Sequence, residues 1–305
     1  MARAAPVIRP LAQDDLAAAD RIVRAAFLIE ESRLGSLQQL LRLQADGWFL
    51  ALEDGTPVGV IGGLDYGRFV YGGLFAVAPE AQGRGIGAAL LQHWLGWIAS
   101  RGIPLVVVDA SDAGAVLCRR VGFVAVDATD IWEYGGDGGG QATGGADAGA
   151  SVRFGAGAEE GTPAGSVRAL HADEVEALAA ADARIFGGDR RAVLRELVTA
   201  HPGRALVICA SDGAVRSYLV AQPRRLGPWA AASPADAAAL LAAAWALGFE
   251  SGPVALVPRA NVDAPPLLER AGLRHVRSTH YMVLGARRPP GRRAQIYGAT
   301  SAALG

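Results

Sequence analysis

A glycine-rich segment runs from Gln82 to Gly87, between an apolar stretch and a run of residues with helical periodicity. Glycine occupies every second position in it, at Gly83, Gly85 and Gly87. Glycine allows tight or positive-φ main-chain geometry, and it lets a ligand approach without meeting a Cβ atom. The first amides of a helix lack intrahelical partners, and the helix dipole adds partial positive charge there. The segment therefore predicts a main-chain cradle for a diphosphate, with Arg84 available for a charge-assisted contact.

Two other interpretations of this segment stay open, because glycine-rich turns are common. The first is a loop that only lets a strand and a helix pack tightly and binds no ligand. The second is a dinucleotide-binding turn, which needs a parallel βαβ unit and an acidic residue at the end of the next strand. Asp109 stands at such a position, but the strands before the segment read as an antiparallel meander, which does not fit that turn.

The surrounding sequence reads as helices and strands that would hold the segment in place. Asp14 and Asp15 cap a first helix, and two apolar runs joined by Asp54 and Gly55 predict an antiparallel hairpin. A later short run of Leu and Val is typical of a strand that is covered on both faces. The expected helices cover 14–27, 34–44, the stretch from the segment to 100, and 113–121, and the expected strands cover 48–52, 58–63, 70–77, 105–108 and 123–134.

The second half of the chain repeats this order at one fixed offset. Gly122 falls on Gly272, and the apolar positions before them match without a gap. We interpret the two halves as two copies of one fold. In the second copy the glycine segment is replaced by 232–237, where Pro234 removes a donor and Asp236 would repel a phosphate. The second copy is expected either to pack against the first and shape its substrate pocket or to bind a different ligand.

Residues 135–165 are dominated by Gly and Ala, with almost no large apolar side chain. Such a stretch cannot bury enough surface to offset its ordering entropy, so a flexible linker is predicted. The expected organisation is a domain at 1–134, the linker at 135–165 and a second domain at 166–305. Both domains are expected to be of the α+β (mixed α/β) class.

The composition predicts a soluble cytoplasmic protein. With 29 basic and 30 acidic residues, the net charge of −1 indicates neither a nucleic-acid nor a membrane partner. The second half has an excess of Arg, which reads as a solvated surface, with attraction to an anionic ligand left open. Cys118, Cys209 and the five His residues show no disulfide or metal-ligand spacing, so no metal is expected. No apolar run approaches the ~18 residues that a membrane span requires.

The stretch from Val77 to Leu91 resembles the acetyl-CoA signature of the GNAT superfamily of N-acetyltransferases, whose core is Gln/Arg-x-x-Gly-x-Gly/Ala. Gln82, Gly85 and Gly87 occupy the diagnostic positions. A later stretch, 115–123, resembles the second motif of the superfamily. The second half resembles the degenerate GNAT-like domain of tandem members, including its closing segment at 296–298. The resemblance implies two tandem GNAT-like domains, each with a mixed, mostly antiparallel central sheet flanked by helices.

The resemblance also implies an activity and a cosubstrate. The chain would move an acyl group, with acetyl as the expected one, from acetyl-CoA to a primary amine of a small molecule, by direct transfer in a ternary complex. Proximity would supply much of the acceleration, and a strand amide near Phe75 or Val77 would stabilise the oxyanion. The residues implied in binding acetyl-CoA are Phe75, Ala76, Val77, Gln82, Gly83, Arg84, Gly85, Ile86, Gly87 and Ala88.

The sequence departs from the superfamily at the group that protonates the departing thiolate. Many members have a Tyr in the second motif, and the matching residue here is Cys118. Cys118 is either a proton donor or a small buried apolar side chain. Asp109 is placed where the central strands of the fold separate, and it either orients the acceptor or acts as its base, or serves a turn or helix cap. Asp65 and Tyr66 either face the acceptor or form an exposed turn.

A second function, of a different class, is kept beside the first. The missing Tyr and the lack of an evident Glu base also suit a non-catalytic acyl-CoA-binding sensor or regulatory module. Neither the acceptor nor the oligomeric state can be read from this sequence, because acceptor pockets are built by loops without a general signature.

Overall fold

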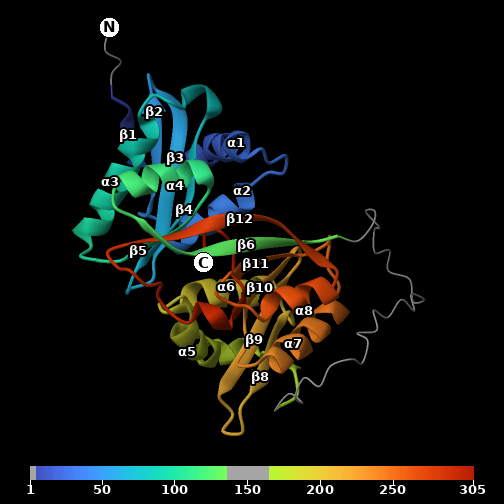
Figure 1. The fold of residues 1–305 in the computed structure, drawn as a ribbon. Coiled ribbons are helices and arrows are strands. Elements are labelled where there is room, and N and C mark those ends of the chain that lie inside the picture. Colours follow the sequence, from blue (N-terminus) through green and yellow to red (C-terminus); the bar gives the residue numbers. More distant parts are fainter. Residues whose placement is uncertain (1–4, 136–164) are drawn as a thin grey trace. The chain divides into compact units, whose positions relative to one another are not determined.

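The structure is a computed structural model that describes residues 5–135 and 165–305 of the chain. The described residues form two compact units (Figure 1). Unit 1 contains the residues up to 126 together with 280–289 and 302–305, and unit 2 contains 127–279 and 290–301. Each unit therefore includes sequence from both halves of the chain. The domain limits at 134 and 166 stay predictions, and the predicted linker lies, apart from its two end residues, outside the described residues.

The sheet of unit 1 is mixed and mostly antiparallel. Its strands follow the order β1-β2-β3-β4-β5-β12, in which only β4 and β5 run parallel. Asp54 and Gly55 have positive φ values of 50° and 79° in the turn between β2 and β3, which confirms the predicted hairpin. The strands are β1 (Val7–Pro10), β2 (Trp48–Glu53), β3 (Thr56–Asp65), β4 (Val70–Val77), β5 (Val106–Ala110) and the last part of β12 (Leu273–Leu284).

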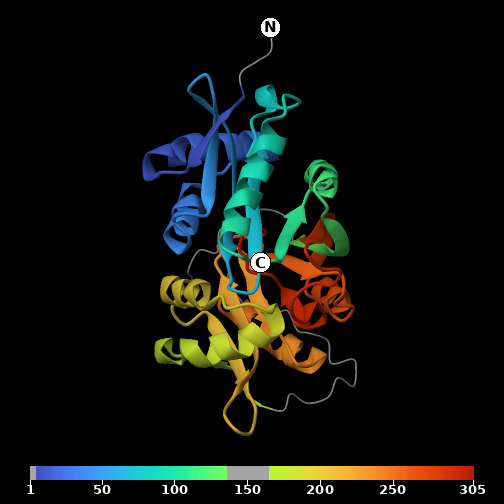
Figure 2. The ribbon, with the colours of Figure 1, turned by 90° about the vertical axis from the view of Figure 1, so that its left-hand side faces the viewer.

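Helices cover both faces of this sheet. Figure 2 shows α1 and α2, in dark blue, on one side of the blue strands and α3, in teal, on the other. Buried Leu90, Leu91, Trp94 and Ile98 form the predicted apolar face of α3. The helices of unit 1 are α1 (Leu16–Phe27), α2 (Leu34–Leu43), α3 (Ile86–Ser100) and α4 (Asp112–Arg120), with short 3-10 turns η1 (Gln13–Asp15) and η2 (Pro79–Ala81).

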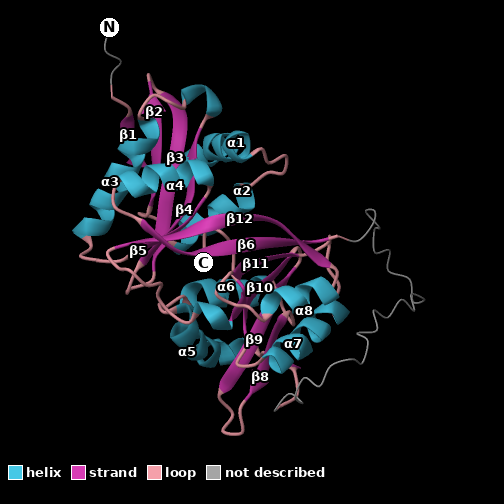
Figure 3. Cartoon of the chain, viewed as in Figure 1, coloured by secondary structure: helices cyan, strands magenta, loops and turns pink. Residues whose placement is uncertain are grey.

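Unit 2 repeats this plan, as the fixed offset predicts. Its strands follow the order β6-β11-β10-β9-β8-β7, of which Figure 3 labels the run from β6 to β8, and β13 pairs with β10. Its strands are β6 (Val124–Tyr134), β7 (Arg168–Ala169), β8 (Ala205–Cys209), β9 (Val215–Gln222), β10 (Arg225–Ala230), β11 (Val254–Pro258) and β13 (Ile296–Gly298). Its helices are α5 (Val175–Phe186), α6 (Arg191–Ala200), α7 (Pro234–Ala246) and α8 (Ala264–Arg270), with the 3-10 turns η3 (Ala172–Glu174) and η4 (Arg293–Gln295).

The two halves of the chain exchange their last long strands. β6 follows α4 in sequence, but it pairs with β11 of unit 2, from Thr129 opposite Pro258 to Glu133 opposite Val254. β12 follows α8, but its last five residues pair with β5 of unit 1. The α+β class and the tandem arrangement are confirmed. The exchange was not predicted, because the apolar pattern of a strand does not specify which sheet it joins.

Candidate functional site

The central feature of unit 1 is a gap between β4 and β5. The two strands are paired only over three residues, with Gly72 opposite Val108 as the last pair. β4 continues to Val77 without a β5 partner in the described part of the chain. Asp109 is the first residue of β5 beyond the last pair. The strands therefore separate at this point, and the β4 edge that faced β5 becomes available to a ligand.

A β-bulge in β4 lies at the start of this gap. Leu74 has a φ of 52°, in the left-handed region, which is uncommon for a side chain of this type. The pairs Val60–Ala76 and Gly62–Gly73 enclose one more residue on β4 than on β3. An extra residue of this kind reverses which face of the sheet the following side chains occupy.

The bulge turns two predicted binding residues toward α3. Before it, a Cβ on Gly72 would collide with Trp94 of α3 at 2.4 Å, so Gly72 faces that helix. After it, the Phe75 and Val77 side chains lie 3.5 and 3.7 Å from the position of a Cβ on Gly87, at the start of the same helix. Without the extra residue, Phe75 and Val77 would face the opposite side of the sheet.

The glycine segment connects the end of β4 to α3 and has the geometry of an anion-binding turn. Gly83 and Gly85 both adopt left-handed conformations, with φ values of 74° and 82°. A Cβ added to either glycine would meet no atom within 4 Å, so the space beside them is open. The first hydrogen bond along α3 runs from the Ala89 amide to the Gly85 carbonyl, at 3.0 Å. The amides that precede Ala89 can therefore point outward and converge on an anion.

Two side chains of the segment hold the loop itself. The Gln82 amide donates to the Val77 carbonyl at 3.0 Å, which fastens the turn to the end of β4. The Arg84 guanidinium pairs with Glu53 of β2 at 2.8 Å and also donates to the Glu80 carbonyl. The charge-assisted contact of Arg84 with a ligand stays a prediction, since its guanidinium lies on Glu53 here.

The ten residues predicted to bind acetyl-CoA thus lie at the end of β4, in the loop that follows η2 and in the first turn of α3. The side chains of Ala76 and Ile86 are buried in the core of unit 1, so these two residues offer a ligand only their main chain. Gly87 is close to three side chains, because a Cβ there would also meet Leu117 of α4 at 3.3 Å. Their roles as ligands stay predictions.

Cys118 lies on α4 with only 3 % of its surface exposed. Burial raises the pKa of its thiol to about 11, although the nearby Arg119 charge lowers it in part. The thiol is therefore protonated at neutral pH, and it is a weaker acid than an ordinary thiol. The structure thus strengthens the interpretation of Cys118 as a buried apolar side chain, while its catalytic role stays untested.

Asp109 belongs to a polar cluster that the sequence did not reveal. Its carboxylate accepts a hydrogen bond from the Tyr71 hydroxyl. Tyr281 of β12 lies directly opposite Asp109 in the antiparallel ladder, and its ring centroid is 6.5 Å from that of Tyr71. Tyr71 could have been noticed from strand alternation, whereas no local signal connects Tyr281 to Asp109.

The connection before β4 is an exposed turn at Gly67 and Arg68, but Tyr66 is not part of its exposed surface. Tyr66 is buried, and its hydroxyl donates to the Leu304 carbonyl at 2.7 Å. Asp65 accepts from the Gly67 amide at 2.7 Å, as in a turn that a side chain closes. Of the two candidates, therefore, only Asp65 serves the turn itself.

In unit 2, the strands that correspond to β4 and β5 are β10 and β11, and another part of the chain fills the gap between them. β10 and β11 share a single parallel pair, and β13 then pairs antiparallel with β10, with Gly298 opposite Trp229. The next residue, Ala299, donates to the Leu256 carbonyl of β11 at 2.7 Å. β13 and the residue after it therefore bond to β10 and β11 in the place that an extended ligand would otherwise take.

The start of α7 is likewise closed by side chains. The Ser233 hydroxyl accepts from the Asp236 amide at 3.2 Å and caps the helix. The Asp236 carboxylate is only 1 % exposed, and it accepts two bonds from Arg216, at 2.9 and 2.7 Å, and one from Ser217 at 2.6 Å. A buried acid thus stands at the position that Ile86 has in unit 1, and the lack of a phosphate cradle in the second copy stays a prediction.

The residues that the structure describes contain no group of His, Cys, Asp and Glu side chains arranged to hold a metal ion. Within the same ranges, no helix combines the length and the apolar character that crossing a membrane demands.

Comparison with known proteins agrees with this geometry. Residues 14–123 match the model of the acetyltransferase (GNAT) family, and residues 178–298 match the model of an acetyltransferase (GNAT) domain. No curated protein matches the chain. Among solved structures, a protein described as an acetyltransferase from Pyrococcus horikoshii is similar over 98 % of this chain and 96 % of its own, with 24 % identity and a TM-score of 0.79. A GCN5-related N-acetyltransferase from Sphaerobacter thermophilus is similar over 95 % and 98 %, with 18 % identity and a TM-score of 0.62. At these identities the likeness concerns the fold.

Proposed function

Because the chain belongs to the GNAT acetyltransferase family, with two GNAT domains in tandem, we propose that unit 1 moves an acetyl group from acetyl-CoA to a primary amine of a small molecule. Members of this family use acetyl-CoA, and the finer assignment to an amine rests on the site. The observation that carries the proposal is the pair of left-handed glycines, Gly83 and Gly85, at the start of α3 beside a separated pair of strands.

The glycine segment suits the diphosphate of CoA. Its outward amides supply several donors at the positive end of a helix dipole, and no side chain limits the approach of the ligand. The β4 edge beyond the bulge suits the extended arm of CoA, because its main-chain groups lack β5 as a partner. The thioester would then lie near the point where β4 and β5 separate.

The reaction joins the amine nitrogen to the thioester carbon, and the carbon–sulfur bond breaks. The amine must first lose a proton, since an ammonium has no lone pair for attack. Asp109 is our candidate for the base, because it lies at the separation point with its carboxylate fixed by Tyr71. An amide of β4 near Phe75 or Val77 would stabilise the negative charge that develops on the carbonyl oxygen.

The thiolate that leaves must finally take up a proton. A thiolate is a tolerable leaving group, and solvent can protonate it after departure. Cys118 is the candidate donor by position in the family, but its raised pKa of about 11 makes the transfer to a thiolate of ordinary basicity unfavourable. We therefore propose that Cys118 contributes less to the rate acceleration than Asp109 does.

Unit 2 is proposed to bind no second CoA. β13 fills the gap between β10 and β11, and Asp236 closes the start of α7. The chain would then hold one acetyl-CoA, in unit 1.

The test is release of free thiol from acetyl-CoA, followed with a panel of primary amines. Acceleration by at least one amine, with the acetylated amine identified by mass spectrometry, is the expected result. Binding of CoA without thiol release for any amine would instead favour the non-catalytic acyl-CoA sensor, which the weak acidity of Cys118 also suits.

A further inference from the structure

The two faces of the unit 1 sheet are occupied differently around the gap. Gly87 and Leu117, from α3 and α4, lie close to Phe75 and Val77 on one face. If CoA binds as proposed above, its arm lies along the β4 edge in the gap, and these packed side chains fill the space under α3 and α4. A nucleophile that attacks the thioester carbon must then come from the opposite face of the sheet.

That opposite face carries the cluster of Tyr71, Asp109 and Tyr281. Val108 lies 3.0 Å from a Cβ on Gly72, which faces α3, so its neighbour Asp109 faces the other way. Tyr281 shares the face of Asp109, because residues directly opposite each other in an antiparallel pair project to the same side. Both rings are well buried, with 2 % of Tyr71 and 4 % of Tyr281 exposed.

A second piece of the C-terminal half lies on the same face. Ala303 packs against Gly73, so closely that a Cβ on Gly73 would be 2.7 Å from the Ala303 Cα. Leu304 is buried and accepts the hydrogen bond from Tyr66. The residues that surround the amine-facing side of the gap therefore come from both halves of the chain.

We propose that the second half of the chain builds one wall of the acceptor site of unit 1, with Tyr281 as a positioning residue. The ring of Tyr281 lies beside the Tyr71–Asp109 pair, limits the access of water to the carboxylate and presents an aromatic surface to the incoming amine. This inference rests on the proposed function. It assigns a purpose to the strand exchange, because β12 brings Tyr281 to Asp109 only by leaving unit 2.

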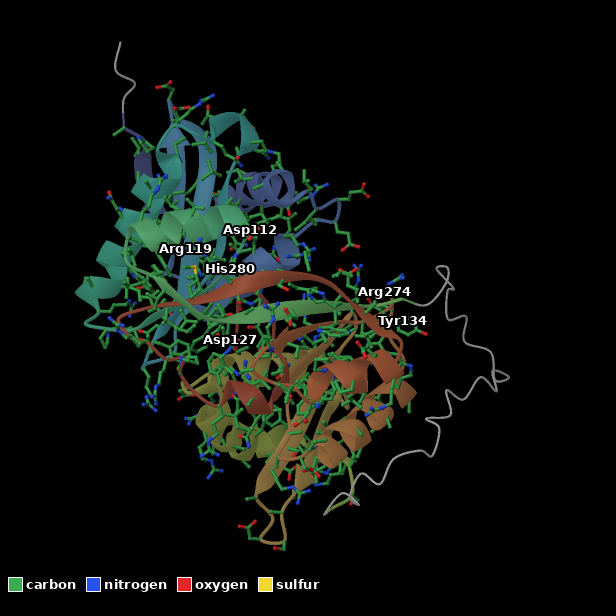
Figure 4. All side chains as sticks on the ribbon, in the orientation of Figure 1. Asp112, Arg119, Asp127, Tyr134, Arg274 and His280 are labelled. Atoms are coloured by element: carbon green, nitrogen blue, oxygen red, sulfur yellow. The ribbon has the colours of Figure 1, made fainter. Side chains whose placement is uncertain are left out.

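Contacts on both sides of Tyr281 hold β12 in place beside β5. The preceding residue, His280, contacts Asp112 at the start of α4, with its Nε2 atom 2.8 Å from the carboxylate (Figure 4). The following residues continue the ladder to Leu284 opposite Val106. A rigid strand holds a site residue more accurately than a loop does.

A control substitution at a matched position distinguishes a merely structural role of Tyr281 from the proposed positioning role. Val283 lies two residues further on the same strand and the same face, is fully buried, and stands opposite Val107 instead of Asp109. Truncation at Val283 removes packing from the same ladder without touching the polar cluster.

The kinetic test uses the full chain with an amine from the panel. We expect Tyr281→Ala to lower kcat/KM for the amine at least tenfold and to leave the Kd for acetyl-CoA within twofold of wild type. Tyr281→Phe, which keeps the ring, and Val283→Ala should both stay within threefold of wild type. Equal losses in Tyr281→Ala and Val283→Ala, or unchanged amine kinetics in Tyr281→Ala, would overturn the proposal. A loss in Tyr281→Phe as large as in Tyr281→Ala would overturn the assignment to the ring.

A second test needs no acceptor. In a chain with Cys118→Ala and Cys209→Ala, the variant Tyr281→Cys is incubated with bromoacetyl-CoA. The introduced thiolate attacks the bromomethyl carbon, so a carbon–sulfur bond forms and bromide leaves. We expect mass spectrometry to find the adduct at position 281, blocked by excess CoA, and no adduct in Val283→Cys. If no amine is a substrate, the proposed function fails, and this labelling still decides the inference. Absence of the adduct in a variant that binds CoA would overturn it.

Discussion

Asp109 and Tyr281 lie directly opposite each other on paired antiparallel strands, although one comes from the first half of the chain and the other from the second. The pair exists because β12 leaves its own unit and completes the sheet that holds the glycine segment. A chain that evolved by duplication can thus make one site from two copies, with the second copy contributing side chains instead of a second cofactor site.

The first prediction concerns Asp109 as the base. Asp109→Asn keeps the size of the side chain and an acceptor for the Tyr71 hydroxyl, but it removes the proton acceptor. We expect kcat with an amine to fall by roughly 10²-fold or more, the range of general-base catalysis, with acetyl-CoA affinity unchanged. Steady-state kinetics and calorimetry measure the two quantities. Asp14→Asn, at an exposed position in the 3-10 turn η1, is the control and should retain activity.

The second prediction concerns the glycine segment. Gly85→Glu places a side chain and a negative charge where the diphosphate is expected, at a position with nothing within 4 Å. The Kd for CoA should rise at least tenfold, which corresponds to about 1.4 kcal/mol. Gly102→Glu is the matched control, because Gly102 also has a positive φ, 68°, and open space around it, beyond the other end of α3. Equal affinities of the two variants would contradict the placement of CoA.

The third prediction concerns the buried thiol of Cys118. Since its pKa of about 11 makes it a poor proton donor, Cys118→Ala should change kcat by less than about threefold and leave the pH profile unaltered. A large loss of kcat, with an alkaline limb that disappears in the variant, would show that the thiol takes part.

The same thiol should make the fold sensitive to alkali. Its pKa is raised from 9.0 in the reference state to about 11 in the folded chain, so the unfolded chain loses the proton first as the pH rises. The stabilisation is present below pH 9 and is lost between pH 9 and 11, by at most about 3 kcal/mol. Denaturant melts of wild type and Cys118→Ala across this range measure it. Parallel curves for the two proteins would argue against the raised pKa.

The fourth prediction concerns a buried ion pair in unit 2. Asp182 accepts two bonds from Arg190, at 2.8 and 2.7 Å, and a third from the Tyr218 hydroxyl. Burial and the Asp182 charge raise the pKa of Tyr218 well above its usual value, so this hydroxyl remains a donor. Asp182→Asn leaves the guanidinium buried without its counter-charge, and we expect a loss of ~3 kcal/mol or more in the free energy of unfolding.

The exposed pair of Glu176 with Arg195, at 2.6 Å, is the control for that measurement. Glu176→Gln should change the free energy of unfolding by less than ~1 kcal/mol, because solvent screens the pair. Similar losses for the two variants would contradict the expectation that the buried pair contributes more to the free energy of unfolding than the exposed pair.

The elements around the glycine segment could be predicted because their signals are local. The periodicity of α3 and the hairpin at Asp54 and Gly55 follow from residues close in sequence, and the repeat follows from the one fixed offset that aligns Gly122 with Gly272. Ser111 caps α4 by accepting from the Gly114 amide, and Asn261, two residues before the N-cap of α8, accepts from the Ala264 amide.

The features that were missed depend on tertiary structure. The bulge at Leu74 places a residue with poor left-handed propensity at φ 52°, which only its surroundings can impose. The alternation of side chains after it is therefore reversed relative to a regular strand. The pattern of β12 does not specify which sheet it joins, so Tyr281 could not be assigned to the site from its own neighbourhood.

Calorimetric titration of acetyl-CoA into the full chain tests the central claim, that the amides at the start of α3 hold the diphosphate of acetyl-CoA. Our account predicts one site per chain, because β13 and Asp236 close the equivalent place in unit 2, and a binding curve that weakens at least tenfold in Gly85→Glu. Absence of binding to the folded wild-type protein, or two equivalent sites per chain, would contradict it.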